Sequence, residues 1–444
     1  MNSVLNIYTD LSENERRTFL LHTIYSLLDG LILGGFTLNE FVFQKNFHPD
    51  LFKISLLFQL GVLVLPFSIF FTQFYEKVAN KKRLLARIGL FTRIPLLLFV
   101  FFPILPADQL QSDWVQNVFL IVFLLFYFAS PFTIPLINHL LKLNYSPDKL
   151  GKLYSYSWSI NLFTQLISSL LFGWLLDEFP TSFAYVYPVL GVIGLFSIYL
   201  ISKIKNETEQ KYYDDISLFE SWGNTLDKSI KILAENKPFR DFQIGMMIYG
   251  VAFLMNLGVV AKFLNDQYDL NYSEVAGYKG IALVLAILTF PLFGLILDRK
   301  DPRRFGNMSF ILCALFFALM VVALYFHQPI HINSVRIFIF LALAYIAYGF
   351  FQSSMTILWG IGSSYFAPND QVATYQAIHC SLTGIRGLLA PIIGTLLFSM
   401  FSFVGAFIAS ILLLLFAIYY HRKSMAKWKI LRGESSQEPA NIKL

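Results

Sequence analysis

The sequence is poor in cysteine and in charged residues. Its 444 residues include two cysteines, Cys313 and Cys380, which lie in different apolar stretches, so neither a disulfide framework nor a cysteine-based zinc site is expected. Charged residues make up 14% of the chain, whereas soluble domains carry about 25%. A chain with so few charges is not expected to fold as an ordinary soluble domain.

Signatures of enzymes and of metal sites are also missing from the sequence. It has no Gly-x-x-x-x-Gly-Lys-Ser/Thr loop for nucleotide phosphates, which argues against an ATP-driven pump. His327 and His331 flank Pro329, and proline breaks the helical geometry that a histidine metal pair would need. We therefore predict no enzyme, no cofactor and no metal.

Hydrophobic residues, by contrast, make up 56% of the chain and gather in long runs. A helix needs about 20 mainly apolar residues to cross the hydrocarbon core of a bilayer. Twelve segments meet this requirement, which predicts an all-α membrane protein. The segments are 19–43, 51–74, 84–105, 114–141, 151–177, 182–203, 239–264, 271–297, 304–326, 333–361, 371–399 and 402–421.

Lysine and arginine are distributed unevenly between the loops that join these segments. One set of loops and the C-terminal tail are rich in them, whereas loops of the other set such as PADQLQSD and DEFPTS have none. Because positive charge stays on the cytoplasmic side, the rich side and both termini are predicted to be cytoplasmic. The net charge of +6 follows from this pattern, so no nucleic-acid partner is expected. Arg16 and Arg17 precede an apolar stretch too long for a cleavable signal, which is interpreted as the first span.

A polar segment, residues 204–238, divides the predicted spans into six plus six. Its apolar residues recur at near-helical spacing from Leu218 to Leu233, which predicts an amphipathic helix on the cytoplasmic membrane surface. A role as a covered linker and a role in binding a partner both remain open. The expected organisation is an N-terminal bundle over 1–203, this linker over 204–238, a C-terminal bundle over 239–421 and a cytoplasmic tail over 422–444.

The two halves carry a related charge pattern. In the loop after the second span, Glu76-Lys77 precedes Lys81-Lys82; after the eighth span, Asp298-Arg299 precedes Arg303-Arg304. The two acids are 222 residues apart (298 − 76), which is half the chain. This spacing predicts two pseudo-symmetric six-helix bundles related by a parallel repeat.

Together these features resemble the major facilitator superfamily over essentially the whole chain. That family carries a loop motif Gly-x-x-x-Asp-Arg-x-Gly-Arg-Arg. Gly294, Asp298 and Arg299 match its start, and the pair Arg303-Arg304 matches its end. The second copy departs from the motif by one extra residue and the lack of its glycine, and the first copy has Glu76 in place of the aspartate.

The resemblance implies the fold of that superfamily, alternating access, and a central cavity lined by spans 1, 2, 4, 5, 7, 8, 10 and 11. The charged loops would then form a cytoplasmic gate in which an acid accepts hydrogen bonds from arginine. The alternative is that the bases only set the topology. The candidate gate residues are Gly294, Asp298, Arg299, Arg303, Arg304, Glu76 and Lys77.

Two charged residues lie near the middle of predicted spans, where a charge is costly unless it is paired or faces water. Asp29 is the candidate proton-coupling site, and Arg386 is the candidate for an anionic substrate group or for pairing with Asp29. His379 lies two turns before Arg386 on the same helix face and is a second coupling candidate, because histidine titrates near neutral pH. A purely structural pair between Asp29 and Arg386 is the alternative.

Other side chains at comparable depth, or near the external helix ends, complete the predicted sites. The candidate substrate contacts are Gln165, Asn161, Asn256, Gln352, Tyr25 and Trp158. The candidate outer gate comprises Glu40, Lys53, Lys262 and Glu274, although interfacial snorkelling explains these four equally well.

We thus predict a monomeric secondary transporter of the inner (cytoplasmic) membrane, surrounded by lipid, that carries a small organic solute with proton coupling. An uncoupled facilitator or a lipid flippase is the alternative within transport. The alternative of another class is a transporter-like receptor or assembly protein. A receptor should carry a large extra-membrane domain or tail, and the sequence has only the short tail GESSQEPANIKL.

Overall fold

The computed structural model describes residues 11–67, 81–204, 218–332, 335–368 and 371–431. These residues are almost entirely helical, which confirms the predicted all-α class. The first half of the chain contains α2 (Glu13–Phe36), α3 (Asn39–Phe47), α4 (Leu51–Leu63), α6 (Lys81–Arg93), the 3-10 helix η1 (Ile94–Ile104), α7 (Ala107–Leu110), α8 (Asp113–Tyr127), α9 (Ser130–Asn144), α10 (Pro147–Glu178) and α11 (Phe183–Ile201).

The second half follows a helix, α12 (Leu218–Glu235), in the stretch where the amphipathic helix is predicted. Its position on a membrane surface stays a prediction. The second half contains α13 (Lys237–Leu254), α14 (Leu257–Asp266), α15 (Tyr272–Asp298), α16 (Pro302–Ala323), β1 (Ile330–Ile332), β2 (Val335–Ile337), α17 (Ile339–Ile361), the 3-10 helix η2 (Gly362–Phe366) and α18 (Val372–Leu431).

The described helices match eleven of the twelve predicted spans and part of the twelfth. Ten continuous helical segments are long and apolar enough to cross a membrane. The last of them contains Ser402 in a non-helical conformation (φ 55°, ψ −162°), which divides α18 into two spans at the predicted place. The shorter apolar helix α4 lies within the remaining predicted span, 51–74, of which residues 68–74 lie outside the described residues.

Several predicted spans are broken within their length. The first is split between α2 and α3, the fourth between α8 and α9, and the seventh between α13 and α14. The third continues as a 3-10 helix that contains Pro95 and Pro103, because proline lacks the N–H that an α-helix needs. Hydropathy averages over such breaks and therefore did not reveal them.

The predicted start of the tenth span at residue 333 is wrong. An antiparallel hairpin precedes the helix, with Ile330 opposite Ile337 and Ile332 opposite Val335. Apolar and polar residues alternate on both sides of Asn333-Ser334, which is a hairpin pattern rather than a helical one. Arg336 consequently lies on a strand between spans 9 and 10, in a connection predicted to lack positive charge.

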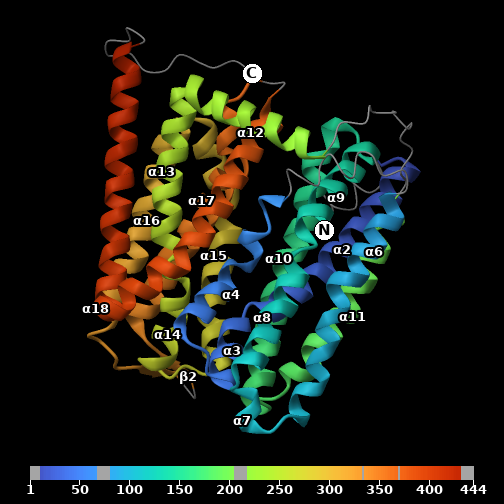
Figure 1. Ribbon diagram of the computed structural model, residues 1–444, viewed down its shortest axis with the longest axis vertical. Helices are drawn as coiled ribbons and strands as arrows, with labels where there is room; N and C mark the ends of the chain where they lie inside the picture. The colour runs from blue at the N-terminus through green and yellow to red at the C-terminus, as the bar shows by residue number, and fades with distance from the viewer. Residues whose placement is uncertain (1–10, 68–80, 205–217, 333–334, 369–370, 432–444) are drawn as a thin grey trace.

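The helices pack mainly within each half, and a few contacts join the halves. In Figure 1, α2–α11 lie mostly on one side and α13–α18 on the other. The halves meet where α10 packs on α15, α4 on α14 and α18, and α3 on α14. We call the end that holds α3, α7 and the β1–β2 hairpin the hairpin end, and the opposite end, which holds α12, the linker end (Figure 1).

Two glycines bring α2 unusually close to α10. A Cβ atom added to Gly30 would lie 2.3 Å from the carbonyl oxygen of Asn161, and one added to Gly34 would lie 2.4 Å from that of Gln165. In this tight seam Ser168 donates a hydrogen bond to the carbonyl of Leu31 (2.7 Å). The packing therefore requires these two positions to lack a side chain.

Replacing Gly30 with alanine is expected to destabilise the protein. The added methyl group meets both the hydroxyl group of Thr164 and the backbone of Asn161, so α2 and α10 must separate, at a cost of about 1–3 kcal/mol. Thermal unfolding of the purified variant should show a lower melting temperature than that of Gly277→Ala, where an added Cβ has nothing within 4 Å. Equal melting temperatures for the two variants would contradict the tight α2–α10 seam.

Candidate functional site

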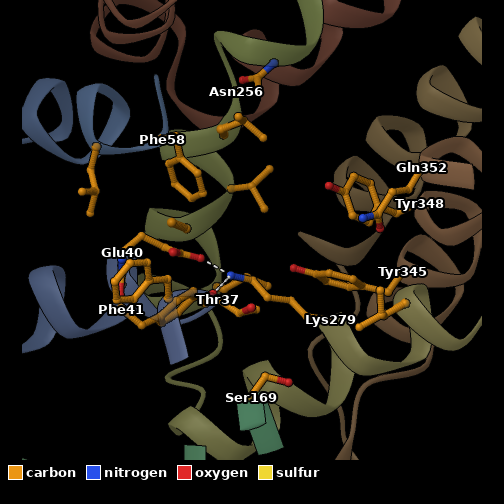
Figure 2. Close-up of a pocket in the computed structure, with 18 of the residues that line it drawn as sticks. Thr37, Glu40, Phe41, Phe58, Ser169, Asn256, Lys279, Tyr345, Tyr348 and Gln352 are labelled. Atoms are coloured by element: carbon orange, nitrogen blue, oxygen red, sulfur yellow. Dashed lines mark hydrogen bonds and ion pairs between the residues drawn. The ribbon is translucent and has the colours of Figure 1, made fainter. Parts of the chain in front are cut away.

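A cavity of about 340 Å³ lies between the two halves. This volume is in the range of small-molecule sites. Helices of both halves form its wall, and Figure 2 shows their side chains converging on it. Its polar lining residues are Thr37, Asn39, Glu40, Tyr127, Gln165, Ser169, Asn256, Lys279, Tyr345, Tyr348 and Gln352.

Glu40 and Lys279 form an ion pair that is part of the cavity wall (Figure 2). Glu40 belongs to α3 of the first half and Lys279 to α15 of the second, so the pair links the halves. The two side chains are 6% and 22% exposed, respectively. Few solvent molecules can therefore screen the interaction, and loss of one partner would leave a poorly solvated charge.

The break between α2 and α3 leaves a backbone carbonyl group that binds Lys279. The helix ends at Phe36, so carbonyl groups in its last turn lack intrahelical partners. The carbonyl of Thr37 accepts a hydrogen bond from Lys279 Nζ (2.5 Å). Lys279 Nζ also lies 5.6 Å from the ring centre of Phe41, a cation–π contact.

Three of the predicted substrate contacts line the cavity: Gln165, Asn256 and Gln352. Asn256 lies at the break between α13 and α14 and donates to the carbonyl of Ala406 (3.1 Å). Its Oδ1 atom is buried and has no hydrogen-bond partner. The site thus offers amide groups from both halves, one of them with an unused acceptor.

Aromatic rings form a large part of the lining. Phenylalanine and tyrosine rings can pack against the faces of an organic ligand while tyrosine hydroxyls bind its polar groups. The aromatic lining residues are Phe36, Phe41, Phe58, Phe253, Phe316, Phe317, Tyr127, Tyr345 and Tyr348. Because Glu40 and Lys279 neutralise each other, the wall carries no net charge.

The structure places Asp29 outside this cavity. Asp29 accepts a hydrogen bond from Asn161 Nδ2 (3.2 Å), so this predicted substrate contact is also engaged within the first half. The cation that acts on Asp29 is Arg93, whose guanidinium donates to the carbonyl of Phe126 (3.0 Å). Among the described residues no ion pair joins Asp29 to Arg386, so the pairing proposed from the sequence is not formed in this structure.

Arg386 and His379 are built into the packing between α13 and α18. Arg386 donates to the carbonyl of Met246 (2.5 Å), and its guanidinium lies 5.7 Å from the ring centre of Tyr249. The Nδ1 atom of His379 is 2.9 Å from Gln243 Oε1. Neither residue is part of the cavity lining, and the same is true of Tyr25 and Trp158. Both helices belong to the second half, so these contacts do not join the halves.

The four residues of the predicted outer gate do not contact one another. Each has a separate partner, so the four do not form one gate in this structure. The observed pairs are Glu40 with Lys279, Lys53 with Asp113 (2.5 Å), Lys262 with Asp266 (2.7 Å) and Glu274 with Arg336 (2.8 Å). The first is the only one of these four pairs that joins the two halves.

The predicted cytoplasmic gate is described only in part. Glu76, Lys77 and the side chain of Asp298 lie outside the described residues. Arg303 is buried and forms an ion pair with Asp301 (2.8 Å). Burial alone would raise the pKa of Asp301, but hydrogen bonds and the positive charge of Arg303 outweigh it and lower that pKa. Of the other motif residues, Arg299 and Arg304 are exposed, and Gly294 faces open space.

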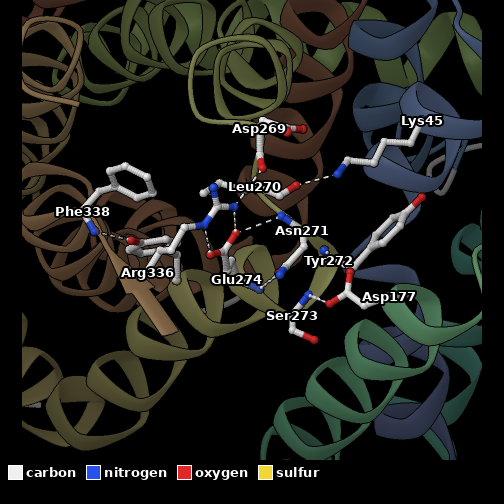
Figure 3. A network of polar contacts seen from close by, with 11 residues as sticks. Lys45, Asp177, Asp269, Leu270, Asn271, Tyr272, Ser273, Glu274, Arg336 and Phe338 are labelled. Atoms are coloured by element: carbon white, nitrogen blue, oxygen red, sulfur yellow. Dashed lines mark hydrogen bonds and ion pairs between the residues drawn. The ribbon is translucent and has the colours of Figure 1, made fainter. Parts of the chain in front are cut away.

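At the hairpin end, the first half holds the start of α15 (Figure 3). Asp177, at the end of α10, accepts hydrogen bonds from the backbone N–H groups of Tyr272 (2.7 Å) and Ser273 (2.8 Å). Lys45 of α3 donates to the carbonyl of Leu270 (2.6 Å). A carboxylate at a helix N-terminus is favoured by the helix dipole, so Asp177 caps a helix of the other half.

Residues of the second half also stabilise the start of α15. Asn271 and Glu274 form a capping box at the start of α15. Glu274 also accepts two hydrogen bonds from Arg336 of the hairpin (2.9 and 2.8 Å). Arg336 therefore fastens the β1–β2 hairpin to the helix that Asp177 caps.

The described polar contacts at the linker end remain within each half. In the first half Ser146 donates to Glu15 (2.8 Å); in the second, Asn236 donates to Tyr375 (3.0 Å) and Ser424 to Asp241 (2.7 Å). Among the described residues, the polar contacts between the halves are thus concentrated toward the hairpin end.

Asp177 and Lys279 were not identified from the sequence. Lys279 lies seven residues into α15, and a lysine that far inside a predicted span is a signal that could have identified it. Asp177 lies at the end of a span, beside a loop, where a carboxylate is unremarkable. Only its contact with the other half distinguishes it.

Comparisons with known proteins agree with this architecture. The family model described as Major Facilitator Superfamily matches residues 18–340. No curated protein matches the chain. Among solved structures, a mutant of the nucleoside transporter NupG superposes with a TM-score of 0.69 at 15% identity, covering 93% of this chain and 100% of that one.

Two further solved structures are similar over comparable lengths. A structure titled for substrate recognition in proton-dependent oligopeptide transporters gives a TM-score of 0.67 at 11% identity, covering 94% of this chain and 99% of that one. The D-xylose-proton symporter gives 0.63 at 12% identity, covering 91% and 97%. At these identities the likeness concerns the fold alone.

Proposed function

The chain belongs to the major facilitator superfamily, and we propose that it is a proton-coupled secondary transporter that moves a small organic solute by alternating access. The observation that carries the proposal is the cavity between the halves, with amide and aromatic groups from both and an ion pair across its wall. A cavity shared by two halves can be exposed to either side when the halves rock against each other.

We propose that the linker end faces the cytoplasm and that the protein resides in the cytoplasmic membrane. The lysine- and arginine-rich loops support this orientation. The positive residues at the hairpin end that depart from the rule, Lys45, Lys53 and Arg336, each have a polar partner there. With both termini cytoplasmic, the contacts at the hairpin end would close the outer side of the protein.

The substrate class follows from the lining of the cavity. An anion would need an unpaired cation, but Lys279 is paired with Glu40, and Arg386 lies in the α13–α18 seam. We propose an uncharged or zwitterionic solute with an apolar or ring-shaped face. Its faces would pack on the aromatic rings and its polar groups would bind Gln165, Asn256 and Gln352.

We propose Glu40 as the proton-coupling carboxylate in place of Asp29. A coupling group must change its surroundings between the two states. Glu40 reaches across to the other half, so rocking of the halves separates it from Lys279. Asp29 is held by Asn161 of its own half, which moves with it.

A transport assay tests the proposal directly. Ligands are first found by thermal shift of the purified protein with sugars, nucleosides, short peptides and carboxylates at two pH values. The best ligand is then offered to proteoliposomes with and without an imposed proton gradient. We expect accumulation above the external concentration only with the gradient.

Three other results would replace this function. Equilibration that is unaffected by the gradient would identify an uncoupled facilitator. Movement of labelled lipid between leaflets, without solute uptake, would identify a flippase. Absence of binding and of transport for every solute would favour a receptor or assembly role.

A further inference from the structure

A second cavity, of about 490 Å³, opens at the hairpin end between the two halves. Its walls come from α3, α4 and the turn that joins them in the first half, and from α14 and the segment after it in the second. None of the residues that line it also lines the central cavity. The polar lining residues are Gln44, Lys45, His48, Lys262, Asn265, Asp266 and Asp269.

This outer cavity carries charges of both signs. Lys262 and Asp266 form an ion pair on α14 (2.7 Å). Lys45 donates to the carbonyl of Leu270 and lies in the field of Asp269. The part of the cavity wall around Asp269 therefore offers hydrogen-bond acceptors, whereas Lys262 and the exposed ring of His48 offer hydrogen-bond donors.

Gln44 forms a buried part of the outer cavity wall. It is 6% exposed, and its Oε1 atom is buried without a hydrogen-bond partner. A buried acceptor without a donor costs about 1–3 kcal/mol. A ligand N–H group could satisfy this acceptor once the Gln44 side chain rotates toward the cavity.

The backbone is also unusual here. Three non-glycine residues of the described chain have positive φ, and two of them, His48 (48°) and Asp269 (43°), line this cavity. Such conformations persist where the surrounding structure imposes them, and they gather at binding sites. The two residues come from opposite halves.

We propose that the outer cavity binds a small zwitterion, with its ammonium group toward Gln44 Oε1 and the Asp269 carboxylate and its carboxylate toward Lys262. Lys262 is paired with Asp266, but its side chain is 31% exposed and its ammonium group has three N–H donors, so it can also bind a ligand carboxylate. Two lysines and two aspartates give the wall balanced charge, which favours a ligand with both signs over a simple ion. Because both halves supply the wall, the bound ligand holds α3 against α14. This site does not depend on the transport proposal.

Isothermal titration calorimetry on the purified full chain in lipid nanodiscs tests the site. The probes are the zwitterions β-alanine, 4-aminobutyrate and 6-aminohexanoate, with butylamine and butyrate as counterparts of single charge. We expect one zwitterion to bind, and both single-charge probes to bind at least about tenfold more weakly, the value of one ionic contact.

Two variants locate the binding. Gln44→Leu removes the buried acceptor, and Asp269→Asn removes the charge while keeping a residue that tolerates positive φ. Each should weaken binding about tenfold or more, with an unchanged gel-filtration profile and melting temperature as evidence of folding. Glu178→Ala, at an exposed position that lines neither cavity, should leave the affinity for the zwitterion unchanged.

Three results would overturn the site. One is loss of binding in Gln352→Leu but not in Gln44→Leu, which would place the zwitterion in the central cavity. Another is butylamine or butyrate binding as tightly as the zwitterions, which would indicate a simple ion site. The third is that no zwitterion binds with a Kd below about 10 mM.

Discussion

The Glu40→Gln variant is expected to lose proton-driven accumulation of solute almost completely. The change removes a titratable group from the central cavity and leaves Lys279 without its carboxylate partner. Removing one partner of a buried ion pair costs about 3–5 kcal/mol. The outward-closed state should therefore also be destabilised relative to the outward-open one. Uptake into proteoliposomes with and without a proton gradient measures the effect, and solute exchange at equal concentrations shows whether binding survives.

The controls separate coupling from folding. Asp29→Asn removes the carboxylate near the middle of the first span, which contacts Asn161 of its own half, and should retain accumulation. The double variant Glu40→Gln with Lys279→Met removes both charges. It should recover the stability that Glu40→Gln alone loses, without recovering coupling. Normal accumulation in Glu40→Gln together with its loss in Asp29→Asn would return the coupling site to Asp29.

The Asp177→Ala variant is expected to open the hairpin end. Asp177 accepts two backbone hydrogen bonds from the other half at a helix N-terminus. Hydrogen bonds to a charged group contribute about 1.5–3 kcal/mol, and loss of a helix cap costs about 0.5–2 kcal/mol. A shift of the conformational equilibrium by about 1–3 kcal/mol corresponds to a roughly 5–150-fold change in the ratio of the two states.

Distances between spin labels at positions 108 and 325 would measure this shift. Asp108 lies on α7 of the first half, and Tyr325 follows α16 of the second, both at the hairpin end and both exposed. We expect a larger fraction of long distances in Asp177→Ala, and a smaller gain in Asp177→Asn, which keeps an uncharged cap. Glu178→Ala, at the exposed neighbouring position, is the matched control. Identical distributions in Asp177→Ala and Glu178→Ala would show that the cap does not hold the halves together.

Some cavity-lining residues could be predicted because depth along a helix can be counted in the sequence. Gln165, Asn256 and Gln352 lie near the middle of their spans, and all three line the central cavity. The same reasoning selected Asp29 and Arg386, which do not line this cavity. Depth fixes how far a residue lies from the membrane surface but not which neighbour its side chain faces, and Arg386 faces the glycine-bearing side of α13, where Gly250 leaves room for it.

Pairing of charges was not accessible from the sequence for a related reason. Glu40 was assigned to an outer gate with Lys53, Lys262 and Glu274, all near the ends of predicted spans. The break between α2 and α3 instead directs Glu40 toward Lys279, which is 239 positions away in the chain. Hydropathy treats a broken helix and a continuous one alike, so neither the break nor the partner was visible.

The sequence by itself determined the membrane class, the twelve spans and the family fold, because apolar run length and the positions of lysine and arginine are local properties that the bilayer selects directly. Tertiary structure alone decided which charges meet: Glu40 with Lys279 in the cavity, and Asp177 with the start of α15. These contacts join residues of opposite halves, and their geometry depends on helix breaks and on how the halves dock. Inside the membrane a charge must find a partner, but many arrangements of the same spans could supply one.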